Sequence, residues 1–355
     1  MAWATRSDLA KAEAPLSPGA ILFAEEPADA AIALAPDQLT ALEAVSRAAL
    51  AGAGLGPRDR VLIALNQPGS IAVAQLARAA APLVASVAVT GAAGRLRLLN
   101  TIRALKPNAL VCTPCGAADF LARLYMEFNI DPLELGLEKI LMAGEIASPG
   151  TPGRIAKEFE VDLAQLYLDP LCGAALAWRK GAAWKVAGEG RLALASVGRD
   201  EIVAEDAAGD AAGELVLRQG DRILRTGQVV AGARGDAGFF NHTVGDHVLV
   251  RGRWLSLPLL RRQLSLVDGI ASWTLTIDRG SRTLDAARLE IGFERETLVT
   301  NKMWKSLVEQ AVAAVTPIQV EVTTEYTEKG ARPPERVQDA RGHHLGLKRA
   351  EVTAA

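Results

Sequence analysis

The sequence contains few cysteines and histidines and no long apolar run. Three cysteines, Cys112, Cys115 and Cys172, cannot build a disulfide framework, and so low a number suits a reducing cytosol. The four histidines are scattered, so no metal-ligand cluster is predicted. The run AAAPLVASVAV is too short to span a membrane, and the first twenty residues lack the apolar core of a signal peptide. We therefore expect a cytoplasmic protein without a bound metal.

The sequence also lacks an excess of charge of either sign. Its 39 basic residues nearly balance 41 acidic ones, and no basic run occurs. Nucleic acid and anionic membranes are therefore not expected as partners. Half of the 355 residues are hydrophobic, which is enough for a sizeable core in one large domain with a smaller one.

Helical and strand patterns alternate from about residue 40 to residue 170. Each strand is apolar on both faces, which is typical of a parallel sheet covered by helices on both sides. The sequence therefore predicts an α/β fold with a parallel sheet over 58–168. The expected strands are 59–66, 83–90, 108–114, 138–145 and 162–168, and the expected helices are about 40–54, 70–81, 94–106, 116–129 and 152–160.

Beyond residue 170 the pattern changes to short strands separated by Gly and Asp turns. We expect an N-terminal domain over 1–255, with its α/β part at about 40–170 and a β-rich part at about 171–255. A small C-terminal α+β domain should cover 256–355, with a helix at 301–315, an edge strand at 318–327 and a loosely ordered tail.

Several short motifs occur in a fixed order along the chain. They are Thr113-Pro114, Asn129-Ile130-Asp131-Pro132, Ala143-Gly144-Glu145, Tyr167, GELVL (213–217), LRTGQ (224–228), GDHVLVRG (245–252) and RVQDAR (336–341). This order resembles the phenylacetate–CoA ligases, which belong to the adenylate-forming (acyl-CoA synthetase, AMP-binding) superfamily. The resemblance covers roughly residues 20–341. It implies an adenylation domain followed by a small lid domain, and an activity that joins an acid to CoA at the expense of ATP, releasing AMP and pyrophosphate.

The chain departs from that family at the positions that handle ATP. The stretch ILFAEEPADAAIALAPDQL (21–39) stands where the family has a Gly/Ser/Thr phosphate loop, and it offers Glu25 and Glu26 instead of glycines and hydroxyls. Leu171 stands at the acid that helps to position Mg²⁺, and Gln228 replaces the aspartate that binds the ribose. Pro333 stands at the catalytic lysine. The resemblance thus places a vestigial nucleotide site at Glu145, Tyr167, Asp169, Arg225 and Gln228, with no catalytic residue and no metal.

Three hypotheses remain open at this point. The leading one is a catalytically degenerate relative, a pseudoenzyme, that binds or regulates, with an acyl or CoA-type molecule or a protein as partner and no cofactor. The second is an active acyl- or aryl-CoA ligase that uses ATP, Mg²⁺ and CoA, with Asp169, Gln228 and Arg332 in altered roles. The third is a thiol-based protein that uses Cys112 and Cys115 at a helix N-terminus. Glu145 ends an expected strand and could be a helix-capping or structural acid rather than a nucleotide contact. The oligomeric state is open.

Overall fold

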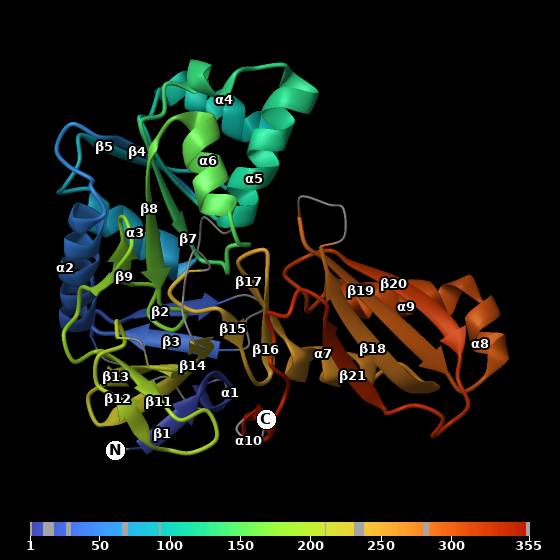
Figure 1. Ribbon diagram of the computed structural model, residues 1–355. Helices are drawn as coiled ribbons and strands as arrows, with labels where there is room; N and C mark the ends of the chain where they lie inside the picture. Colours follow the sequence, from blue (N-terminus) through green and yellow to red (C-terminus); the bar gives the residue numbers. More distant parts are fainter. Residues whose placement is uncertain are drawn as a thin grey trace. The chain divides into compact units, whose positions relative to one another are not determined.

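The computed structural model describes residues 2–9, 18–25, 30–65, 70–91, 94–209, 211–230, 238–279 and 284–352 (Figure 1). The chain divides into two compact units, Met1–His242 and Thr243–Ala355, and each is described by itself. The domain boundary expected at residue 255 falls within strand β17 (Arg253–Ser256), which pairs with β16 (His247–Val250) inside the second unit.

The first unit contains a seven-stranded sheet in the order β10-β9-β8-β7-β6-β4-β5. Its strands are β4 (Arg60–Ala64), β5 (Ser86–Val89), β6 (Ala109–Cys112), β7 (Lys139–Ala143), β8 (Asp162–Leu168), β9 (Ala175–Arg179) and β10 (Trp184–Val186). The strands β5, β4, β6, β7 and β8 are parallel neighbours, whereas β9 and β10 add in antiparallel fashion. The predicted α/β fold with a parallel sheet is confirmed.

Helices cover both faces of this sheet, because each central strand is apolar on both sides. Val61 and Ile63 of β4 join the core beneath one set of helices, and Leu62 and Ala64 join the core beneath the other. The first set is α2 (Pro36–Gly52) and α3 (Ile71–Ala80), and the second is α4 (Arg95–Leu105), α5 (Pro114–Arg123) and α6 (Thr151–Phe159). Each fully buried aliphatic side chain contributes roughly 1.5–3 kcal/mol to the two cores.

The segment after α5 continues as one π-helical turn, Leu124–Phe128, and then as the 3₁₀ turn Pro132–Leu135. Asn129 ends the π-helical turn in the left-handed conformation with φ 50°. Asp131 and Glu134 form a capping box on the 3₁₀ turn, which explains the Asn129–Pro132 motif as a local structural element.

A second sheet of the first unit has the order β1-β14-β13-β11-β12, with β15 (His242–Thr243) paired to β14. Its strands are β1 (Ala2–Thr5), β11 (Leu192–Ala195), β12 (Ile202–Ala204), β13 (Gly213–Gln219) and β14 (Arg222–Val230). The sequence did not predict β1, which lies parallel to β14 and is followed by α1 (Arg6–Leu9). A separate hairpin joins β2 (Ile21–Glu25) to β3 (Ala30–Leu34).

The second unit contains a four-stranded sheet in the order β20-β19-β18-β21. Its strands are β18 (Ile270–Asp278), β19 (Ala286–Phe293), β20 (Val320–Tyr326) and β21 (Glu335–Asp339), and its helices are α7 (Leu257–Leu264), α8 (Glu296–Thr300), α9 (Lys302–Ala313) and α10 (Arg349–Val352). Strand β20 is an edge strand, as the alternation of 318–327 predicts. Part of the tail expected to be loosely ordered forms β21, because Val337 packs on the core and the strand pairs with β18.

A buried ion network ties the end of β21 to the start of β19. The Asp285 carboxylate accepts hydrogen bonds from Arg279 and Arg341, and Arg341 also donates to Asp339 and, at 2.9 Å, to the carbonyl oxygen of Leu249. Burial alone would raise the pKa of Asp285. The adjacent guanidinium groups of Arg279 and Arg341 outweigh burial and hold this pKa below its usual value.

This network predicts a large stability loss for Asp285→Ala. The substitution leaves the buried Arg341 charge with Asp339 as its remaining carboxylate, and breaking a buried pair costs about 3 kcal/mol or more. Urea unfolding followed by tryptophan fluorescence measures the effect. Asp268→Ala, which removes an exposed ion pair with Arg295, is the matched control and should change the unfolding midpoint little. Equal effects of the two substitutions would contradict the assignment.

Candidate functional site

The strand order of the parallel sheet marks one edge as the place where a ligand would bind. The chain leaves β4 for β5 through α3 on one face and returns to β6 through α4 on the other face. The order therefore reverses between β4 and β6, and in such sheets ligands bind beyond the carboxyl ends of the strands at this point. The residues that follow these ends are Thr113 after β6, Glu145 after β7 and Asp169 after β8.

Glu145 caps the N-terminus of α5. The Thr113 hydroxyl accepts a hydrogen bond from the Gly116 amide at 3.1 Å, and Pro114 occupies the first helical position. One oxygen of the Glu145 carboxylate accepts from the Cys115 amide at 2.9 Å, and the other accepts from the Cys115 thiol at 2.7 Å. The carboxylate thus occupies the positive end of this helix, where an anionic ligand would otherwise be attracted. A contact between Glu145 and a nucleotide stays a prediction.

The cysteines of this corner are packed into the protein. Cys112, Cys115 and Cys172 are all buried, and none of the three forms a disulfide. Burial, together with the negative charge of Glu145, raises the pKa of Cys112 to about 12. Burial also raises the pKa of Cys172 well above its usual value. Because the thiolate is the reactive form, the surroundings of Cys112 disfavour the thiol-based hypothesis.

Tyr167 and Gln228, both expected in the nucleotide site, are brought into direct contact. The Tyr167 hydroxyl at the end of β8 donates a hydrogen bond to the Gln228 side-chain oxygen on β14 at 2.8 Å. The Tyr167 ring packs on Phe239, with ring centroids 5.0 Å apart, and on Phe240 at 6.1 Å. Only 1% of Tyr167 is exposed, so an adenine could not stack on this ring unless a phenylalanine moved. Burial and the nearby Asp169 raise the pKa of Tyr167 well above its usual value.

Asp169 lies next to this pair, in the turn after β8. One carboxylate oxygen, Oδ1, accepts hydrogen bonds from the amides of Leu171 at 2.8 Å and Cys172 at 3.0 Å. The other, Oδ2, is buried without a hydrogen-bond partner among the described residues. Burial raises the pKa of Asp169, although the two amides partly offset it. Gly173, with φ +69°, permits this turn, since a Cβ there would lie 2.6 Å from the Ala72 nitrogen.

Arg225 belongs to a separate buried ion pair. Its guanidinium group donates to Glu214 at 2.6 Å and to Asp200 at 2.9 Å, and it lies over the Trp3 ring at 4.8 Å. Glu214 also accepts from the Gly227 amide at 3.0 Å, which fixes the turn of backbone just before Gln228. The role of Arg225 in the structure is therefore to hold β13 and β14 together.

The sequence interpretation missed Glu214, Phe239 and Phe240. Glu214 lies in the GELVL motif, but the register of β13 and β14 places it opposite Val229, so strand pairing alone does not point to its contact with Arg225. The two phenylalanines carry no local pattern that points to Tyr167.

The ligands expected of an adenylate-forming enzyme do not fit these positions as they stand. Leu171, where the resemblance places an Mg²⁺ acid, is a buried apolar side chain. No group of three or more His, Cys, Asp or Glu side chains in the described ranges could hold a metal ion. The hairpin of β2 and β3 pairs Glu25 with Ala30, which leaves four residues, 26–29, as the connection. Glu26 and the rest of this connection lie outside the described residues.

Arg332, the residue considered as a stand-in for the catalytic lysine, lies in the second unit, where it is exposed and pairs with Glu325.

None of the helices in the described part of the chain has both the length and the apolar character that a membrane span requires.

Comparison with solved structures identifies the fold. The chain is similar to a 2-hydroxyisobutyryl-CoA ligase in complex with 2-HIB-AMP and CoA, with a TM-score of 0.72 and 14% identity over 88% of this chain and 71% of that one. It is also similar to the amide bond synthetase McbA from Marinactinospora thermotolerans, with a TM-score of 0.61 and 16% identity over 89% and 67%. A third is a double mutant of o-succinylbenzoate CoA synthetase from Bacillus subtilis, with a TM-score of 0.58 and 14% identity over 82% and 62%.

The chain therefore has the fold of these CoA ligases and of the amide bond synthetase, and the fold that the resemblance implies is confirmed. The narrower resemblance to phenylacetate–CoA ligases stays a prediction. No family model and no curated protein matches the sequence.

The environment of Asp169 predicts how stability depends on pH. A carboxyl group whose pKa is raised by folding keeps its proton more tightly in the folded state, so stability should fall as pH rises from about 4 through the raised pKa. Asp169→Asn keeps the oxygen that accepts both amides and cannot ionise. Relative to the wild type, the free energy of unfolding of this variant should therefore increase toward pH 8, by about 1.4 kcal/mol for each unit by which the pKa of Asp169 is raised.

Chemical denaturation at pH 5, 6, 7 and 8 measures this difference. Asp37→Asn, at an exposed position of α2, serves as the control for the substitution of one aspartate by asparagine. Parallel profiles for Asp169→Asn and the wild type would show that Asp169 does not titrate in the expected range.

The packing of the cysteines predicts slow alkylation of the native protein. At pH 7 a thiol with a pKa of about 12 is ionised in roughly one molecule in 10⁵. Iodoacetamide should therefore modify Cys112 only as fast as the protein unfolds, which mass spectrometry of the digested protein would show. Cys115→Ser should fold normally, since a hydroxyl can replace the thiol as donor to Glu145. Rapid modification at neutral pH would revive the thiol-based hypothesis.

Proposed function

We propose that this chain is a catalytically degenerate relative of the phenylacetate–CoA ligases that acts as a binding or regulatory module. The observation that carries this proposal is the buried hydrogen bond between Tyr167 and Gln228, packed against Phe239. In the family that the sequence resembles, these two positions would face the adenine and the ribose. In this chain the Tyr167 and Gln228 side chains are hydrogen-bonded to each other instead.

Opening this site for a nucleotide would be energetically unfavourable. Tyr167 and Gln228 are both buried, so separating them without replacement costs about 1–3 kcal/mol for each group left unpaired. Displacing Phe239 from Tyr167 and from Trp184, whose ring centroid lies 5.0 Å away, adds the loss of aromatic packing. Bound AMP would have to supply this energy before it gained any net affinity.

The positions expected to hold Mg²⁺ and the phosphates support the same proposal. Mg²⁺ needs carboxylate oxygens in near-octahedral geometry, and Leu171 supplies none. The connection between β2 and β3 contains Glu26 and Pro27 in place of a glycine-rich loop. A proline lacks the amide that such a loop aims at a phosphate, and a glutamate repels the phosphate charge.

The alternative function is an active ATP-dependent acyl- or aryl-CoA ligase with altered site residues. One observation favours it, namely that Oδ2 of Asp169 has no hydrogen-bond partner among the described residues. If the turn that carries Asp169 shifted, this oxygen could serve in place of the missing acid, with Gln228 on the ribose and Arg332 as the cation. ATP, Mg²⁺ and CoA would then be required. For the leading proposal, the degenerate protein, the small molecule that we propose as ligand is an acyl group or CoA.

The deciding experiment is exchange of labelled pyrophosphate into ATP over a panel of aryl and fatty acids. We expect no exchange with any acid, and calorimetry should show Mg-ATP binding no tighter than about millimolar, since two or more charge-assisted contacts are absent. Gln228→Ala should leave these results unchanged, and Asp37→Asn controls for handling of the variants. Steady exchange that Gln228→Ala abolishes would establish the active alternative and overturn the proposal.

A further inference from the structure

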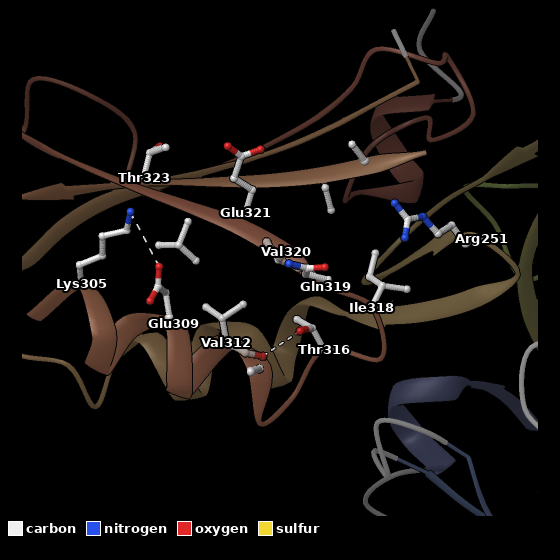
Figure 2. Close-up of a pocket in the computed structure, with 14 residues that line it drawn as sticks. Arg251, Lys305, Glu309, Val312, Thr316, Ile318, Gln319, Val320, Glu321 and Thr323 are labelled. Atoms are coloured by element: carbon white, nitrogen blue, oxygen red, sulfur yellow. Dashed lines mark hydrogen bonds and ion pairs between the residues drawn. The ribbon is translucent and has the colours of Figure 1, made fainter. Parts of the chain in front are cut away.

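A groove of about 570 Å³ lies in the second unit between helix α9 and the edge strand β20 (Figure 2). The residues contributed by α9 and the turn after it share one helix face, with a spacing of three or four positions: Lys305, Glu309, Val312, Ala313 and Thr316. The opposite wall is the continuous run 318–323. Because consecutive residues of β20 line it, the groove follows the backbone of this strand.

The outer edge of β20 is open to an added strand. In the order β20-β19-β18-β21, β19 is its single neighbour, and no other strand in the described ranges pairs with it. Such an edge presents unpaired backbone N–H and C=O groups. Glu321 and Thr323 are exposed beside it. An extended peptide in the groove would therefore find both a row of backbone partners and a helix flank for its side chains.

A cation stands at one end of the groove. Figure 2 shows Arg251 beside Ile318, with its guanidinium group turned toward the groove, whereas Lys305 lies near Thr323. The Nε of Arg251 donates to the carbonyl oxygen of Asp285 at 2.5 Å, which fixes the side chain. Ile318 precedes β20, so Arg251 marks the N-terminal end of this strand. A peptide strand antiparallel to β20 would end there and place its terminal carboxylate at the guanidinium group.

The wall near Arg251 includes two apolar side chains. Ile318 and Val320, both partly exposed, line this part of the groove (Figure 2). An aliphatic side chain on the last peptide residue fits such a lining. The groove therefore suits a ligand that carries a carboxylate next to an apolar group.

A second copy of this chain is a poorer occupant than another polypeptide. If two β20 strands paired antiparallel about Thr323, Glu321 of one would stand opposite Glu325 of the other. Like charges placed directly opposite each other are destabilising.

We propose that this groove binds the carboxyl-terminal segment of a partner polypeptide, which adds to β20 as an antiparallel strand. The terminal carboxylate lies at Arg251, and the last, aliphatic side chain packs on Ile318 and Val320. This inference does not rest on the loss of ligase chemistry, because every lining residue belongs to the second unit. Assays of ATP exchange therefore neither support it nor oppose it.

The test uses a library of labelled octapeptides randomised at the last three positions. The library is made once with free carboxylates and once as amides, and binding to the full chain is followed by fluorescence anisotropy. We expect peptides that end in Val, Leu or Ile to bind. Amidation should weaken them about tenfold or more, because it removes a charge-assisted hydrogen bond. Arg251→Gln should abolish the difference between the two forms.

A pair of neighbouring alanines provides the matched control. Ala313→Trp fills the groove and should abolish binding, whereas Ala314→Trp, at the next and equally exposed position outside the groove, should leave it intact. Circular dichroism shows whether each variant folds. If Ala313→Trp does not fold, the comparison of free and amidated peptides on the wild-type protein still tests the proposal. Failure of every carboxylate peptide to bind, or binding that survives both amidation and Ala313→Trp, would overturn the proposal.

Discussion

The hydrogen bond between Tyr167 and Gln228 is the interaction on which the account of the first unit depends. It joins the end of β8 in the parallel sheet to β14 in the second sheet of this unit, and both side chains are buried. The contacts around it are arranged to keep it in place. Phe239 packs on the tyrosine ring, and Glu214 holds the Gly227 amide one residue before Gln228. Two side chains that the resemblance places at a nucleotide instead stabilise the fold.

The neighbouring residues satisfy one another in the same way. The Glu145 carboxylate accepts a hydrogen bond from an amide at the N-terminus of α5, and one oxygen of Asp169 accepts hydrogen bonds from two backbone amides. A ligase site instead needs polar groups that are fixed in position and left open toward the nucleotide and the transition state. In this chain Glu145 and Oδ1 of Asp169 already accept hydrogen bonds from the protein's own backbone amides. Within the second unit, by contrast, the groove beside β20 leaves backbone and charged groups exposed.

Sequence reasoning found the repeating part of the fold because local pattern decides it. Strand β8 has the bounds that the sequence predicts, since an apolar run directly after a helical pattern leaves little choice. Strands β1 and β21 were missed, because each is short and is held by a distant partner, β14 and β18 respectively. For the site, the resemblance brought Tyr167 and Gln228 together. The packing of Phe239 on Tyr167 is a tertiary contact with no local signature, so it could not be predicted.

The most direct measurement is a crystal structure of the protein grown with saturating AMP and Mg²⁺. The account predicts that Tyr167 and Gln228 remain hydrogen-bonded, as at 2.8 Å here, with Phe239 against the tyrosine ring and no nucleotide beside them. An adenine stacked on Tyr167, with Phe239 displaced and the Gln228 side chain on the ribose, would contradict it.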